Sequence, residues 1–227
     1  MSDAASRLRP QTLLVLAISL DGRLAPASGG AAQLGGPPDR RVLEEALAWA
    51  DGCLIGANTL RLHGSTCLIR AADLLAQRQV QGRSPQPLAV AVSRTGVLPP
   101  DLAFFNQPLE RWLLMPAGAA PLPPSPQAGF ARQLPLLSWP ETLQTLHGAG
   151  LERLVVLGGA QLAASLLQTD SIDALQLTLC PQLLGGPHTW VPAEALLPHG
   201  LSGWRLAQQR PLGGDELLLR YERTRAA

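Results

Sequence analysis

Residues 154–167 read LVVLGGAQLAASLL, and this stretch decides the class of fold. An apolar run of Leu and Val comes first, two glycines follow, and a run rich in Ala and Leu closes the stretch. Short apolar runs that end in glycine are typical of buried strands, whereas Ala and Leu favour helices. We therefore expect a strand, a tight turn and a helix, which is the repeating unit of a parallel α/β sheet.

The same alternation extends along the chain in both directions. Strands are expected at 12–20, 52–56, 87–93, 111–116 and 174–180, and helices at 37–52, 58–62, 72–80 and 140–150. Residues 203–223 have the pattern of an antiparallel hairpin that turns at Gly213 and Gly214. The expected fold class is α/β, with a mainly parallel central sheet, helices on both faces and a C-terminal antiparallel hairpin.

A single domain accounts for this pattern. We expect residues 1–11 to form a flexible N-terminus and residues 12–227 to form one domain. The Pro- and Ala-rich stretch 116–129 is expected to be a surface loop of that domain, because strand and helix patterns resume on both sides of it.

Charge and cysteine content exclude several classes of protein. The formal net charge is +1 and all 18 basic residues are arginines. A nucleic-acid or membrane-surface protein needs a basic face, and Schiff-base or P-loop chemistry needs a lysine. Cys53, Cys67 and Cys180 lie far apart, and the histidines show no ligand spacing, so we expect reduced thiols and no metal. Without a signal peptide or an apolar run of roughly 18 residues, a cytoplasmic protein that enters no membrane is expected.

The glycine pair Gly158–Gly159 is either an anion cradle or only a tight turn. At the carboxyl end of a parallel strand, glycine lets a ligand approach the backbone, and the following helix offers free N–H groups. The pattern is not GxGxxG, which argues against a Rossmann domain. Residues 56–59 form a second such turn. Ser93 and Arg94 suit an adenosine 2′-phosphate, or else belong to a solvated loop.

Four motifs occur in one order and at one spacing: AISLDGRLA (17–25), DGCLIGANTLR (51–61), VLGGAQLAASLL (156–167) and LCPQLLGG (179–186). Together they resemble the pyrimidine reductase domain of riboflavin biosynthesis, of the 5-amino-6-(5-phosphoribosylamino)uracil reductase type. This family is a branch of the dihydrofolate-reductase-like superfamily. The resemblance implies a stand-alone homodimeric reductase, NADPH across the carboxyl edge of the sheet, and hydride transfer to a phosphorylated ribosylamino-pyrimidine.

The resemblance also implies which residues bind the cofactor. Ala17 and Ser19 would flank the nicotinamide, while Gly56 and Thr59 would contact the cofactor. The expected pyrophosphate site is the turn and helix start at Gly158, Gly159, Ala160, Gln161 and Leu162. Ser93 and Arg94 stay the candidates for the 2′-phosphate.

The substrate side departs from the family pattern. Leu47 replaces a common arginine, His63 and Gly64 replace two aspartates, and Leu157 replaces a glutamate, whereas Arg70 is retained. These changes remove charge and hydrogen-bonding groups from a pocket for a polar substrate. A reductase with a different, less polar substrate and a nucleotide-binding protein without turnover therefore remain as alternatives.

Three residues are the candidates for substrate chemistry. Asp21 would orient substrate or relay a proton, unless Asp-Gly is only a turn. His63 would donate a proton near neutral pH, unless it is a plain surface histidine. Arg70 would bind the substrate phosphate, unless it forms an ordinary salt bridge.

Overall fold

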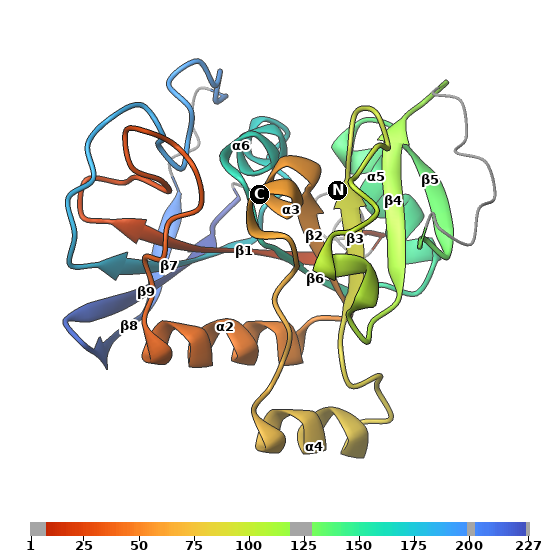
Figure 1. Ribbon diagram of the computed structural model, residues 1–227, viewed down its shortest axis with the longest axis horizontal. Helices are drawn as coiled ribbons and strands as arrows, with labels where there is room; N and C mark the ends of the chain where they lie inside the picture. The colour runs from red at the N-terminus through yellow and green to blue at the C-terminus, as the bar shows by residue number, and fades with distance from the viewer. Residues whose placement is uncertain (1–7, 119–128, 199–202, 226–227) are drawn as a thin grey trace.

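A nine-stranded sheet runs through the molecule, as the computed structural model shows (Figure 1). The structure describes residues 8–118, 129–198 and 203–225. The strand order is β5-β4-β3-β2-β6-β1-β7-β9-β8. The strands are β1 (Gln11–Ser19), β2 (Gly52–Gly56), β3 (Leu88–Val92), β4 (Arg111–Pro116), β5 (Arg132–Leu136), β6 (Arg153–Val156), β7 (Ala174–Cys180), β8 (Trp204–Gly213) and β9 (Glu216–Arg223). Strands β1 to β7 pair in parallel, and β9 and β8 add an antiparallel hairpin.

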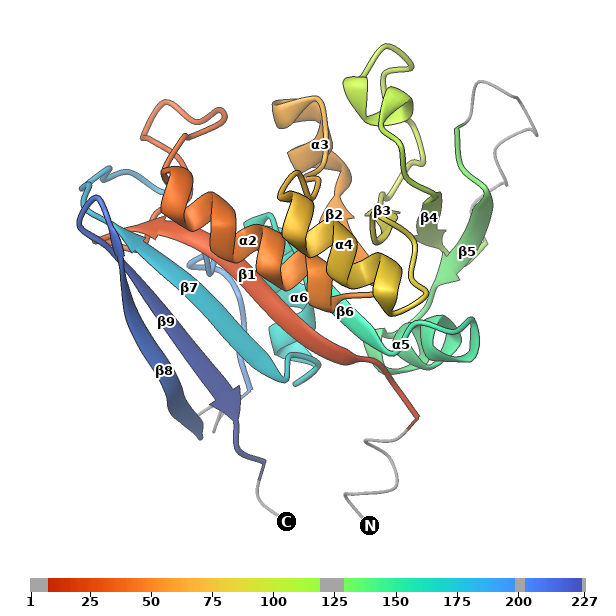
Figure 2. The same ribbon diagram turned by 90° about the horizontal axis from the view of Figure 1, so that it is seen from below.

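Helices cover both faces of this sheet. They are α2 (Pro37–Trp49), α3 (Ala57–His63), α4 (Ala72–Val80), α5 (Trp139–Gly148) and α6 (Ala160–Gln168), with a 3-10 turn at Ala103–Asn106. Seen from below, α2 and α4 lie in front of the sheet and α5 and α6 lie behind it (Figure 2). The expected fold class is confirmed. Within the described ranges, no helix has the length and apolar character to cross a membrane.

Alternating side chains of β1 supply both halves of the core. Leu13 and Val15 belong to the apolar cluster that includes Leu47 of α2, whereas Leu14 and Leu16 belong to the cluster that includes Leu166 of α6. Side chains alternate between the faces of a strand, so an apolar run without polar gaps is buried on both sides. The central strands are therefore fixed between two helical layers.

The first described residues lie at the boundary expected between the N-terminus and the domain. Strand β1 begins at Gln11, and Arg9 already forms an ion pair with Asp173 at 2.5 Å. The ion pair thus joins the residues just before β1 to the loop that precedes β7. Residues 1–7 lie outside the described residues.

Sequence patterns missed β5. This edge strand pairs only with β4, and Pro135 stands opposite Met115. Proline is tolerated at a sheet edge, where one side of the strand needs no hydrogen-bonded partner, and it conceals the strand pattern. The central part of the expected surface loop, 119–128, lies outside the described residues.

Candidate active site

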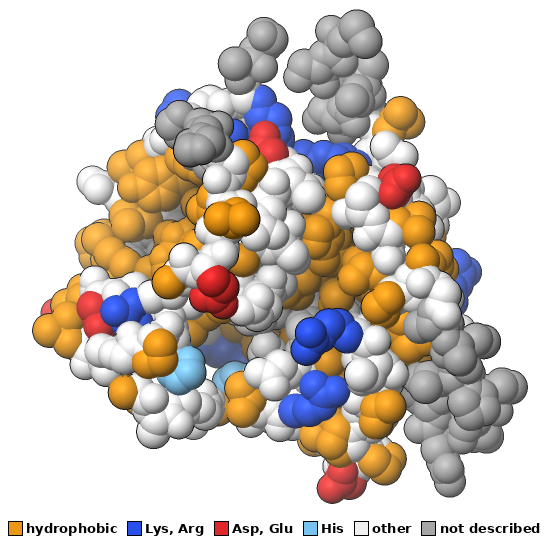
Figure 3. Space-filling view, turned by 90° about the horizontal axis from the view of Figure 1, so that it is seen from above, with side chains coloured by type: hydrophobic (Ala, Val, Ile, Leu, Met, Phe, Trp, Pro, Cys, Tyr) orange, Lys and Arg blue, Asp and Glu red, His pale blue; other side chains and the backbone are white. Residues whose placement is uncertain are grey.

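A cleft of about 720 Å³ lies at the carboxyl edge of the parallel strands. Its walls come from the end of β1, the β2–α3 and β6–α6 turns, the first turns of α2, and residues 188–189. Seen from above, basic and histidine side chains lie around a hollow in the lower part of the view (Figure 3). A volume of this size suits a small organic ligand, and ligands of open α/β sheets bind at this edge.

The cleft collects only some of the residues expected from the sequence. Those that line it are Ala17, Thr59, His63, Arg70, Gly159 and Ala160. Those that do not line it are Ser19, Asp21, Gly56, Ser93, Arg94, Gly158, Gln161 and Leu162.

The two strand-to-helix turns are tied to each other. The Gly159 amide donates to Thr59 Oγ1 at 2.8 Å, and the Gly56 amide donates to the Gly158 carbonyl at 3.0 Å. Gly158 has a φ of +82°, and a Cβ there would lie 3.1 Å from a methyl group of Leu16. The Gly158–Gly159 peptide bond is cis. A side chain at 158 would be strained in this conformation, so glycine is required there.

The N-terminus of α6 opens beside this turn. Because Thr59 occupies the Gly159 amide, the amides that lack an intrahelical partner are those of Ala160, Gln161 and Leu162. The Gln161 side chain itself is bonded to Glu194 at 3.1 Å, and the Leu162 side chain is buried. These two residues therefore offer an anion their backbone, not their side chains.

Asp21 holds a loop instead of facing the cleft. Its carboxylate accepts hydrogen bonds from Ser19 Oγ (2.5 Å) and from the amides of Leu184 (3.1 Å) and Gly185 (2.8 Å). These bonds, that from Ser19 foremost, lower its pKa from 3.8 to about 2. The Asp21 carboxylate thus links the end of β1 to the backbone at 184–185.

Two arginines bring positive charge to the cleft. The Arg70 guanidinium is exposed there and has no side-chain partner within the described residues. Arg40 bonds Glu44 through Nε (2.8 Å) and the Leu68 carbonyl through Nη2 (2.5 Å), which leaves Nη1 without a partner in the described part of the chain. Glu44 also accepts the amides of Arg70 and Ala71 at 2.8 Å. The buried carboxylate of Glu44 thus fixes both the first turns of α2, which carry Arg40, and the segment that carries Arg70.

Sequence reasoning missed Arg40 and misplaced Leu47. Leu47 is fully buried in the core and does not line the cleft, so it removes no hydrogen-bonding group from the cleft wall. Arg40 lies seven residues earlier on α2, which is about two helical turns and hence the same face. This seven-residue spacing on one helix face is the sequence pattern from which Arg40 could have been predicted. Leu157, in contrast, does line the cleft.

Ser93 and Arg94 lie apart from the cleft, just after β3. Ser93 is buried, and its hydroxyl accepts the Gly96 amide at 3.0 Å, so it closes a local turn. Arg94 is exposed. Both stand at the carboxyl edge, on the far side of β2 from β6.

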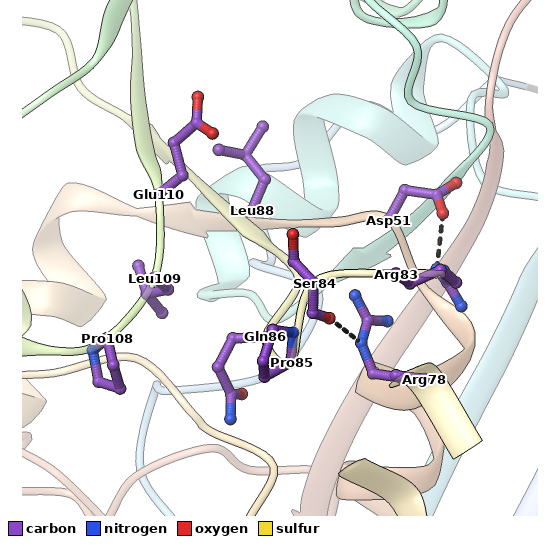
Figure 4. Close-up of a pocket in the computed structure, with 10 residues that line it drawn as sticks. All are labelled: Asp51, Arg78, Arg83, Ser84, Pro85, Gln86, Leu88, Pro108, Leu109 and Glu110. Carbon is purple, nitrogen blue, oxygen red and sulfur yellow. Dashed lines mark hydrogen bonds and ion pairs between the residues drawn. The ribbon is translucent and has the colours of Figure 1, made fainter. Parts of the chain in front are cut away.

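A second cavity of about 500 Å³ lies toward the opposite ends of the strands (Figure 4). Arg78, almost fully buried, donates from Nη1 to the carbonyls of Leu47, Ala48 and Ala50. Arg83 bonds Asp51 at 2.6 Å. Helix α2 has no basic residue in its own last turn, so these arginines serve as its C-terminal cap. Burial lowers the pKa of Arg78 to about 10.

The three cysteines are free thiols, and burial raises the pKa of Cys53 to about 12. In the described ranges, no group of three or more His, Cys, Asp or Glu side chains could hold a metal ion.

The sequence of this chain is similar to known proteins over most of its length. The family model for the RibD C-terminal domain matches residues 10–217. The 2,5-diamino-6-ribosylamino-4(3H)-pyrimidinone 5′-phosphate reductase of Archaeoglobus fulgidus is 27% identical over 186 residues, covering 79% of this chain and 84% of that protein.

Two solved structures share the fold. RibD of Acinetobacter baumannii superposes with a TM-score of 0.79 at 23% identity, and covers 96% of this chain, which spans 58% of that one. Dihydrofolate reductase of Enterococcus faecalis gives a TM-score of 0.54 at 11% identity and covers 95% of this chain and 97% of its own. The expected dihydrofolate-reductase-like fold is therefore confirmed.

Proposed function

Because this chain belongs to the RibD C-terminal domain family, we propose that it is an NADPH-dependent reductase of riboflavin biosynthesis that delivers hydride to a ribosylamino-pyrimidine phosphate. The proposal rests on one observation, which is that two sites for phosphate groups lie in the same cleft. The α6 N-terminus suits a pyrophosphate, and Arg40 and Arg70 suit a second phosphate.

The residues on the cofactor side fit a dinucleotide. Gly158 and Gly159 leave the backbone bare beside the cleft, and the amides of Ala160, Gln161 and Leu162 are available for the pyrophosphate. Ala17, at the cleft wall, would lie beside the nicotinamide, with Ser19 supporting the strand end. When bound, the cofactor supplies the hydride.

The adenosine end would extend along the carboxyl edge toward β3. Gly56 and Thr59 lie on that path, and Ser93 and Arg94 at its end are proposed for the 2′-phosphate. Arg94 is exposed and has no ion pair in the described part of the chain, which leaves its guanidinium available.

The residues on the substrate side would bind the substrate and supply a proton to it. Arg40 and Arg70 hold the substrate phosphate, and the exposed imidazole of His63 provides the proton that accompanies hydride addition. Asp21 acts indirectly, because it fixes the backbone at 184–185 next to the cleft segment 188–189. We further propose that the protein is a cytoplasmic homodimer. Light scattering of the purified protein would test the dimer, and cell fractionation would test the location.

Leu157 supports a second candidate, a reductase of the same fold with a less polar substrate. Its apolar side chain lines the cleft where the family pattern has glutamate. A carboxylate there would bond substrate hydroxyl groups, which leucine does not.

The test is to titrate the purified protein with NADPH by fluorescence, then to add the ribosylamino-pyrimidine phosphate and follow nicotinamide absorbance. Oxidation of NADPH is expected. Binding without oxidation on any pyrimidine or pterin would indicate a nucleotide-binding protein without turnover. Absence of NADPH binding would overturn the proposal.

A further inference from the structure

The second cavity contains a buried arginine whose hydrogen-bonding capacity is only partly used. Arg78 on α4 lines this cavity and is 2% exposed. Its Nε donates to the Ser84 carbonyl at 2.7 Å, and its Nη1 donates to the carbonyls at the end of α2. Its Nη2 has no hydrogen-bond partner in the described part of the chain and is not sealed by protein atoms, so it opens to the cavity. A buried guanidinium nitrogen of this kind is stabilised by an acceptor from a ligand.

The charge of Arg78 also lacks a carboxylate partner. Within the described ranges no ion pair under 4.0 Å includes Arg78, and the nearby Asp51 pairs with Arg83 at 2.6 Å and with Arg153 at 3.5 Å. Glu110 lies on the other side of the cavity (Figure 4). Burial, Arg83 and Arg153 lower the pKa of Arg78 to about 10, which Asp51 opposes. Three arginines thus share one carboxylate, and the guanidinium of Arg78 stays charged at neutral pH.

Ser84 adds two more hydrogen-bond donors beside Arg78. Neither its amide nor its hydroxyl has a hydrogen-bond partner among the described residues. Gln86, in contrast, bonds the backbone of Ile69 through both atoms of its side-chain amide. The rest of the wall includes four apolar side chains, which are Pro85, Leu88, Pro108 and Leu109. Donors next to an apolar surface suit an oxyanion that is carried by an apolar body.

We propose that the second cavity binds a small organic carboxylate, with its oxygens on Arg78 and Ser84 and its apolar body against Leu88 and the two prolines. A carboxylate has one negative charge, which matches one unpaired guanidinium. A phosphate monoester carries nearly two charges at neutral pH and would be left partly uncompensated. The inference goes beyond the proposed reductase function, because the walls of this cavity and of the cleft share no residue.

The experiment is a calorimetric titration of the full chain with four probes. Benzoate combines a carboxylate with an apolar ring, and its dissociation constant should be about 1 mM. Benzyl alcohol keeps the ring without the charge, and acetate keeps the charge without the ring. Each should bind at least about tenfold more weakly than benzoate. Inorganic phosphate should also bind more weakly than benzoate.

Variants of the cavity wall test the position of the carboxylate. Pro85→Glu, at an exposed residue, places a carboxylate next to Arg78 and should weaken benzoate binding at least about tenfold. Ser84→Ala should weaken it about threefold, because one donor is lost. Neither change removes a bond between Arg78 and α2, so both variants are expected to fold. Gln79→Glu adds the same charge on an exposed residue outside the wall and should stay within about twofold of wild type.

A further control separates this cavity from the cleft. Arg70→Ala removes a cleft arginine and should leave benzoate binding unchanged. Binding that survives Pro85→Glu but is lost in Arg70→Ala would place benzoate in the cleft and overturn the proposal. Absence of benzoate binding, equal binding of benzyl alcohol, or tighter binding of phosphate would overturn it as well. None of these measurements involves NADPH, so the reductase function holds or fails separately.

Discussion

Thr59 and Gly159 are 100 residues apart in the chain, yet the Gly159 amide donates a 2.8 Å hydrogen bond to the Thr59 hydroxyl. This bond joins the β2–α3 turn to the β6–α6 turn. The N-terminus of α6, the proposed pyrophosphate site, is thus positioned from a neighbouring strand as well as by its own glycines.

Thr59→Val should weaken NADPH binding about tenfold, because the Gly159 amide loses its acceptor and the turn loses its anchor. Fluorescence titration measures the dissociation constant. The matched control is Thr145→Val on α5, whose exposed hydroxyl bonds only its own helix at Glu141. Equal affinities of wild type and Thr59→Val would remove this turn from the cofactor site.

Arg70→Ala should raise KM for the phosphorylated substrate about 10- to 100-fold, since a guanidinium that pairs with phosphate contributes a charge-assisted hydrogen bond. Steady-state kinetics with the phosphorylated and the dephosphorylated substrate check this, because only the first should respond. Arg205→Ala, which removes an exposed arginine of β8 that pairs with Glu222 of β9, serves as control. A parallel loss with both substrates would contradict phosphate binding at Arg70.

Asp21→Asn should destabilise the fold in a pH-dependent manner. The pKa of Asp21 is lowered from 3.8 to about 2 in the folded protein, so its contribution is fully present above about pH 4 and is lost as the pH falls toward 2. Denaturant unfolding of wild type and variant across this window should give curves that converge at low pH. A difference in unfolding free energy that stays constant from pH 6 to pH 2 would argue that the ionised form has no special role.

Arg78→Ala should lower the free energy of unfolding by about 3 kcal/mol, because it leaves carbonyls at the C-terminus of α2 without donors and creates a void in a buried site. Thermal and denaturant unfolding measure this loss. Gln79→Ala, the exposed neighbour on α4, should leave stability within about 0.5 kcal/mol of wild type. Similar stability of the two variants would show that water satisfies the cap equally well.

The order of elements could be predicted because its signals are local. The apolar run of β6, the glycines after it and the Ala- and Leu-rich α6 each act within a few residues, as does the hairpin turn at Gly213. Strand β5 escaped prediction because pairing with β4, not its own composition, makes it a strand.

The candidate site could be predicted only in part. The glycine turn, Thr59 and Arg70 carry motif signals and do line or border the cleft, and so does His63, which departs from the motif. Asp21 carries one too, but its carboxylate is taken up by Leu184 and Gly185, more than 160 residues later in the chain. Leu47 was expected at the pocket and lies in the core.

By itself, then, the sequence determined the α/β alternation, the family resemblance and the place of the turns, since propensity and apolar periodicity operate over short distances. Only the tertiary structure decided which charges face the cleft. Asp39 lines the cleft, where the Thr178 hydroxyl of β7 bonds its carboxylate and the glycine at position 35 leaves room for it. Arg40 lines the cleft as well, and its guanidinium is bonded to Glu44. Such contacts depend on which strands become neighbours, which no local pattern encodes.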